Sequence, residues 1–88
     1  MKLKENLLLR QVAGSWVVVA VGMACVSFDG MLTLNETGAV LWKALETGTD
    51  REGLISALTS EYEVTAEQAG ADVDDFLSVL HQAGCLED

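Results

Sequence analysis

The spacing of apolar and polar residues along this chain changes at about residue 35. Before that point, apolar residues alternate with polar ones or form short Val-rich runs, as in strands. After it they recur every three or four residues, as in helices. At the junction, Leu32 and Leu34 alternate along a short segment, and Asn35 can accept hydrogen bonds from the first turn of a helix. A short strand is therefore expected to run into a capped helix with almost no loop, which fixes the angle between a small sheet and a helical layer.

Three segments before the junction are predicted to form one antiparallel sheet. The first two, Leu7–Val12 and Trp16–Val21, are predicted to form a hairpin, because Val is favoured on a pleated surface. The third, Met31–Leu34, follows the turn dipeptide Asp29-Gly30. The segment Cys25–Phe28 alternates only weakly, so the sheet has three strands, or four if this segment also pairs.

Three helices are predicted after the junction. They cover Glu36 to about Glu46, Asp50 to about Ser60, and Ala66 to about Ala83. Capping boxes beginning at Thr49 and Thr65 would start the last two, and Gly84 suits the left-handed position that closes a helix. The residues expected to face inward at helical spacing are Ala39, Val40, Trp42 and Leu45, then Leu54, Ile55 and Leu58, and then Ala69, Val73, Phe76, Leu77 and Leu80.

The order of these elements predicts a single α+β domain over residues 1–88. The sheet occupies 1–34 and the three-helix part 35–88, and a chain of 88 residues is long enough for one small core. The link of about five residues between the second and third predicted helices fits a helix-turn-helix pair. A small sheet packed on such a pair is a winged helix-turn-helix-like domain.

One segment could be mistaken for a membrane span. Gln11–Phe28 has no charged residue over 18 positions, which is near the minimum for a spanning helix. It contains Gly14 and Ser15 and is rich in Val, so two strands and a turn are the better interpretation. The N-terminus does not resemble a signal peptide, and two cysteines do not make a disulfide framework. The sequence predicts a cytoplasmic protein with reduced thiols and no membrane partner.

Acidic residues are concentrated in the second half of the chain. Residues 1–44 carry four basic and three acidic side chains, whereas residues 45–88 carry one basic and eleven acidic ones. Most of these acids are expected to be solvated helix faces, and an acidic surface repels phosphate backbones. The predicted third helix has four acids and no basic residue, which argues against a DNA-recognition helix. A winged-helix DNA-binding regulator is therefore only the alternative interpretation, and no nucleic-acid partner is expected.

No residues in the sequence form a recognisable catalytic or metal site. His81 is the only histidine, and Cys85 lies four residues beyond it, but a helix break at Gly84 separates them and two ligands fall short of a zinc site. Nothing supplies a third group to orient a cysteine–histidine pair, and the chain has no Cys-x-x-Cys and no phosphate-binding glycine loop. We therefore expect a protein that is not an enzyme, with no cofactor and no metal.

Peptide binding fits the predicted elements better. In a simple meander, Met31–Leu34 lies at a sheet edge, whose unpaired N–H and C=O groups can accept a partner peptide as a further strand. The third helix would form the other wall, with apolar residues such as Val73 and Leu77 beside the acids Asp72 and Asp74. The alternative, that these apolar residues only fill the core, is at least as good for each one taken singly.

Three stretches of the sequence together resemble the PqqD family. They are Leu-x-Leu-Asn-Glu-Thr-Gly-Ala-x-x-Trp at 32–42, Leu-x-x-x-Tyr-x-Val at 58–64, and Asp-Val-x-x-Phe-Leu-x-x-Leu-x-x-x-Gly-x-Leu at 72–86. The first stretch and the closing Phe-Leu…Gly pattern are fairly specific in combination, whereas any one alone would be weak. The N-terminal hairpin agrees in general character.

The resemblance implies a peptide chaperone. PqqD-like domains bind the leader of a ribosomally synthesised precursor peptide and present it to a modifying enzyme, commonly a radical SAM protein, as in pyrroloquinoline quinone biosynthesis. The leader typically adds as a strand beside the last sheet strand, against the third helix. Mapped onto this sequence, the peptide-binding residues are Met31, Leu32, Thr33, Leu34, Val73, Asp74, Leu77 and His81.

The resemblance also defines what this chain would leave to a partner. It lacks the Cys-x-x-x-Cys-x-x-Cys of a radical SAM enzyme, so it would supply recognition and the maturase would supply catalysis. An assembly module that never touches the substrate is a further alternative, and an exposed edge strand would permit a homodimer. No residue identifies the precursor peptide or the product.

Overall fold

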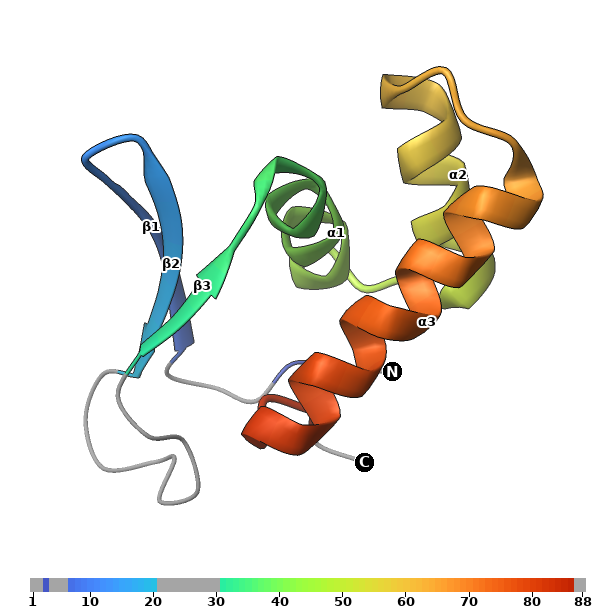
Figure 1. The fold of residues 1–88 in the computed structure, drawn as a ribbon. Helices are drawn as coiled ribbons and strands as arrows, with labels where there is room; N and C mark the ends of the chain where they lie inside the picture. Colours follow the sequence, from blue (N-terminus) through green and yellow to red (C-terminus); the bar gives the residue numbers. More distant parts are fainter. Residues whose placement is uncertain (1–2, 4–6, 21–30, 87–88) are drawn as a thin grey trace.

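A computed structural model describes residues 3, 7–20 and 31–86 of the protein (Figure 1). Three strands precede three helices, which confirms the expected α+β fold. The elements are β1 (Leu7–Val12), β2 (Ser15–Ala20), β3 (Met31–Leu34), α1 (Glu36–Glu46), α2 (Arg51–Glu61) and α3 (Ala66–Ala83). The possible fourth strand at 25–28 and the turn at 29–30 lie outside the described residues.

The sheet is an antiparallel meander in the order β1-β2-β3. Ala13 and Gly14 connect β1 to β2 with φ angles of 51° and 83°, the geometry of a two-residue type I′ turn. Strand β2 therefore begins at Ser15, one residue earlier than the sequence indicated. In the register that results, Trp16 lies opposite Leu34 and Val18 lies opposite Leu32.

One face of the sheet packs on the helices, and Figure 1 shows all three helices on that side. Val18 at the centre of the sheet is completely buried, and Leu34 is buried at the end of β3, so the expected inward direction of Leu34 is confirmed. Leu32 is partly buried against the same cluster. On the opposite face, Leu8 and Val12 of β1 are 46% and 54% exposed. The core therefore lies between the sheet and the helices.

The helix caps explain where the helices begin and end. Asn35 caps α1, Thr65 caps α3, and Gly84 closes α3 with a φ of 77°, all as expected. The cap of α2 is a correction: Asp50, and not Thr49, accepts from the Gly53 N–H at 2.9 Å. Asp and Thr are both good caps, and the sequence alone did not choose between neighbours.

The helical stripes are close to those predicted, with some shifts in register. Trp42, Leu54, Leu58, Val73 and Leu80 are almost or fully buried as expected. Val40, Ile55 and Leu77 are only partly buried, whereas Leu41, which was not expected to face inward, is 1% exposed. No helix among the described residues combines the length and apolar character needed to cross a membrane.

Candidate functional site

Among the residues that the structure describes, strand β3 has a partner on one side only, because β2 is the central strand of the sheet. The residues that flank a two-residue turn form a hydrogen-bonded pair, and such pairs alternate along an antiparallel ladder. Val12 and Ser15 flank the turn, so alternate residues of β2 starting at Trp16 bond to β3. Leu32 and Leu34 thus direct their backbone groups to β2, whereas Thr33 directs its N–H and C=O to the free edge.

The end of β3 is fixed to α1 through a single residue. The Asn35 side chain accepts from the Gly38 N–H at 2.8 Å and from the Thr37 hydroxyl at 2.9 Å. Its backbone C=O accepts from the Ala39 N–H at 3.0 Å. Gly38 permits this close approach, because a Cβ there would lie 3.2 Å from Leu34 Cβ. The direction of β3 is therefore set by the first turn of α1.

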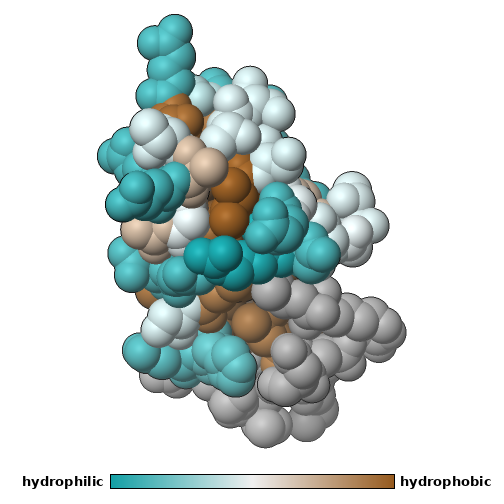
Figure 2. All heavy atoms as spheres, turned by 90° about the vertical axis from the view of Figure 1, so that its right-hand side faces the viewer, coloured by the Kyte–Doolittle hydropathy of each residue, from teal (hydrophilic) through white to brown (hydrophobic). Residues whose placement is uncertain are grey.

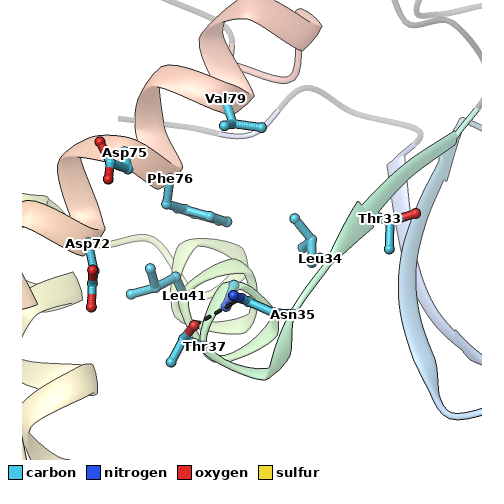
Figure 3. A pocket seen from close by; sticks show the side chains of 10 residues that line it. Thr33, Leu34, Asn35, Thr37, Leu41, Asp72, Asp75, Phe76 and Val79 are labelled. Atoms are coloured by element: carbon cyan, nitrogen blue, oxygen red, sulfur yellow. Dashed lines mark hydrogen bonds between the residues drawn. The ribbon is translucent and has the colours of Figure 1, made fainter.

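Next to this joint lies a groove between β3, the start of α1 and α3 (Figure 3). Its volume is about 440 Å³. Phe76 and Val79 extend from α3 toward Leu34, and Leu41 of α1 lies below them. Val79 is 45% exposed although it is apolar. The complete lining consists of Thr33, Leu34, Asn35, Thr37, Gly38, Leu41, Asp72, Asp75, Phe76 and Val79.

The charged residues of the groove are all acidic. Asp72 and Asp75 lie on the far side of Phe76 from β3 in Figure 3, and both are exposed. No basic residue lines the groove, and the structure gives neither carboxylate an ion-pair partner among the described residues. The groove therefore combines an apolar centre with two uncompensated negative charges.

Asp74 of α3, in contrast, has a basic partner. The Arg51 guanidinium at the start of α2 donates two hydrogen bonds to its carboxylate. The Nε–Oδ1 distance is 2.8 Å and the Nη2–Oδ2 distance is 3.1 Å. These hydrogen bonds hold the pKa of the Asp74 carboxyl below its ordinary value. The pair joins α2 to α3, and both side chains are exposed. Figure 2, which views the molecule from the right-hand side of Figure 1, shows hydrophilic side chains around a narrow apolar strip.

The structure brings some of the predicted peptide-binding residues to this groove and not others. Thr33 and Leu34 line it. Leu32 and Val73 face the core, and Val73 is completely buried. At 100° per residue, Asp74, Leu77 and His81 fall on the flank of α3 that is opposite to the flank carrying Asp72, Asp75 and Val79. Leu77 is partly buried there and His81 is exposed.

Sequence reasoning missed Phe76 and Val79 as groove residues. Phe76 was assigned to the core, and it is indeed only 8% exposed, yet its ring also faces the groove. The signal available in the sequence was an apolar residue, Val79, on one edge of the core stripe. It could not be used, because the stripe has two edges and the sequence does not say which one meets the sheet.

The groove has the features of a binding surface. Among the described residues, no group of three or more His, Cys, Asp and Glu side chains is placed to hold a metal ion. Cys85 is buried, away from the lining of the groove. A free strand edge beside an apolar hollow suits an extended peptide segment.

Two solved structures share this fold over nearly the whole chain. One is TbiB1 in complex with the TbiA(beta) leader peptide, with a TM-score of 0.79 and 24% identity, covering 99% of this chain and 95% of that one. The other is a lasso peptide synthetase B1 complexed with the leader peptide, with a TM-score of 0.76 and 23% identity, covering 99% and 96%. No curated protein matches the chain.

A family assignment comes from the sequence itself. The model of the family described as coenzyme PQQ synthesis protein D matches residues 16–86, which is well over half of the chain. The matched range includes β2 from its second residue, β3 and all three helices, and so every residue that lines the groove. The protein therefore belongs to the PqqD family.

Proposed function

We propose that this protein recognises the leader of a ribosomally synthesised precursor peptide and presents it to a modifying enzyme. The observation that carries the proposal is the groove at the free edge of β3, where outward backbone groups at Thr33 lie beside an apolar hollow. Membership in the PqqD family supports this function. The two similar structures support it further, because each of those proteins is bound to a leader peptide.

The leader is proposed to add to β3 as a fourth strand. Its backbone would exchange hydrogen bonds with Thr33, and its side chains on the core-facing side would enter the hollow between Leu34, Phe76 and Val79. Main-chain bonds of this kind supply affinity, and the pockets for alternate side chains supply selectivity. Met31 would extend the edge, since its backbone has the same direction as that of Thr33.

The remaining predicted residues have supporting roles in this proposal. Leu32 and Val73 would hold the two walls in place from the core, where both are packed. Asp74 and Leu77 would position α3 against α2, through the bond to Arg51 and through partial burial. His81 lies exposed beyond them and would meet a bound partner only on the outer side of α3.

The modifying enzyme is proposed to be a radical SAM protein or a similar maturase. In this proposal the chain supplies recognition through its strand edge, apolar surface and charge, and the maturase supplies the catalysis. A homodimer formed through β3 would occupy the same edge and would therefore compete with the leader. The acidic character of α3 disfavours the alternative of DNA binding.

The test is an amide NMR titration with the leader of a short peptide encoded beside this protein. We expect the largest shifts at Thr33, Leu34, Phe76 and Val79, because these residues border the groove. The β1 edge serves as the internal control and should shift little. Saturable shifts confined to β1, or none even with the maturase present, would rule out leader recognition at β3.

A further inference from the structure

The groove beside β3 has a charge pattern that restricts what can fill it. Its centre is apolar, and its charged residues, Asp72 and Asp75, are both acidic. The basic residues of the described part are already placed elsewhere: Arg51 bonds Asp74, Lys43 lies 4.4 Å from the ring of Trp16, and Arg10 lies on the distant strand β1. The two groove carboxylates therefore lack a positive partner within the described residues.

We infer that the peptide carried by this groove has a large apolar side chain and a lysine or arginine side chain on the same face of its added strand. The apolar side chain would pack on Leu34, Phe76 and Val79, and the basic one would reach Asp72 and Asp75. This inference rests on the proposed function, and it names the class of leader that the same groove selects. Charge complementarity is what identifies the occupant.

The direction of the backbone groups on β3 makes the inference specific about spacing. The peptide residue directly opposite Thr33 has its side chain on the same face as the Thr33 side chain, which is exposed and points away from the core. The peptide residues on either side of it then point toward the groove. The apolar and basic positions should therefore lie two or four positions apart in the peptide, an even spacing, because side chains alternate along a strand.

This spacing rule distinguishes a site in the groove from general attraction. The helical half of the chain is strongly acidic and would attract any basic peptide. Such long-range attraction is screened beyond about 8 Å at physiological salt and is nearly the same for both faces of a strand. Only contact with Asp72 and Asp75 would favour even spacing over odd spacing.

The experiment is a selection of displayed random twelve-residue peptides against the full chain at physiological salt. Three forms are compared: the wild type, the double variant Asp72→Asn and Asp75→Asn, and the control Glu61→Gln and Glu63→Gln. The control removes the same number of negative charges from exposed positions outside the groove. Enriched peptides are then synthesised, their affinities are measured by fluorescence anisotropy, and their sites are mapped by amide shifts.

For the wild type we expect enriched peptides to carry an apolar and a basic residue at even spacing and to shift the Thr33 amide. Moving the basic residue by one position should weaken binding about threefold to tenfold, and so should the groove double variant. The Glu61 and Glu63 control should keep both the affinity and the spacing preference.

Two kinds of result would overturn the inference, and they are distinguishable. Peptides that shift the Thr33 amide but show no basic preference, no spacing rule, or an equal loss in both double variants would refute the charge selection and leave leader recognition standing. Enriched peptides that never shift the Thr33 amide would refute the proposed function, and the inference with it.

Discussion

The two edges of the sheet are chemically alike in their backbone but differ in what stands beside them. Within the described part of the chain, β1 and β3 each have one neighbour, β2, and so each leaves N–H and C=O groups unpaired on its other side. Beside β3 stand α1 and α3, which enclose a groove with apolar and acidic lining. On β1, the side chains of Leu8 and Val12 lie on the sheet face opposite the helices and remain about half exposed.

This difference shows that a strand edge alone is not a peptide site. When a peptide adds to a strand edge, the backbone groups replace hydrogen bonds to water by hydrogen bonds to the peptide. Each replacement stabilises the complex by only about 1 kcal/mol. A second wall adds burial of apolar side chains and a choice between sequences. At the β3 edge α1 and α3 provide that wall, so substitutions there should affect peptide binding more than matched substitutions on β1.

The largest difference is expected in stability, between Leu34→Ala and Leu8→Ala. Leu34 is 8% exposed and belongs to the core, so its truncation should lower the free energy of unfolding by about 2–5 kcal/mol. Leu8 is 46% exposed, and its truncation should cost less than about 1 kcal/mol. Urea unfolding followed by circular dichroism measures both. Equal decreases in the free energy of unfolding would mean that Leu34 and Leu8 contribute equally to the core, contrary to this prediction.

The next largest difference concerns backbone donors, in Thr33→Pro and Gln11→Pro. Both residues direct their N–H away from β2 by the register of the sheet, so neither proline removes a ladder bond. Thr33→Pro removes a donor that the peptide needs and should weaken leader binding about tenfold or more. Gln11→Pro should leave affinity unchanged. Calorimetric titration with the leader separates them, and thermal unfolding checks that both variants remain folded.

A smaller effect is expected for two exposed valines, Val79 on α3 and Val12 on β1. They are 45% and 54% exposed, so truncation to Ala should change stability little and about equally. Val79→Ala should weaken leader binding about threefold, because it removes apolar surface that the peptide would cover. Val12→Ala should not. If Val12→Ala had the larger effect on affinity, the site would be on the other edge.

The smallest effect is expected for Asp74→Asn, through pH. The bond from Arg51 lowers the Asp74 pKa, so the ion pair stabilises the fold above about pH 4 and its contribution is lost as the pH falls through the lowered value. The Tm of the wild type should exceed that of Asp74→Asn slightly at neutral pH, and the gap should close in acid. Asp74→Asn should bind the leader within about twofold of the wild type.

Most of the fold could be predicted from local patterns. The strand Met31–Leu34, the Asn35 cap and the end of α3 at Gly84 follow from short-range chemistry that the residues themselves carry. The exact start of β2 depended on the αL geometry at Ala13, which a residue with a Cβ adopts only rarely. The cap at Asp50 depended on a choice between two suitable neighbours.

The groove was harder to predict than the fold, because it is a tertiary property of two helix flanks. Val73 is in the stripe that the sequence indicated, and it is buried in the core. Which flank of that stripe faces β3 depends on how α3 crosses the sheet, and no local pattern encodes that angle. The residues Asp75 and Val79 could be recognised only after α3 had been placed in space.

The single-residue joint at Asn35 has a consequence for how long a peptide stays bound. Because the hydrogen bonds of Asn35 hold β3 rigidly to α1, the wall of the groove is formed before the peptide binds. The loss of conformational entropy on binding is then that of the peptide, about 1–2 kcal/mol per ordered residue. That loss favours moderate affinity. A micromolar complex that forms at about 10⁶ M⁻¹ s⁻¹ dissociates about once per second. The ordering of the peptide, and not of the protein, should thus limit the residence time of the leader, which is compatible with repeated transfer to a second enzyme.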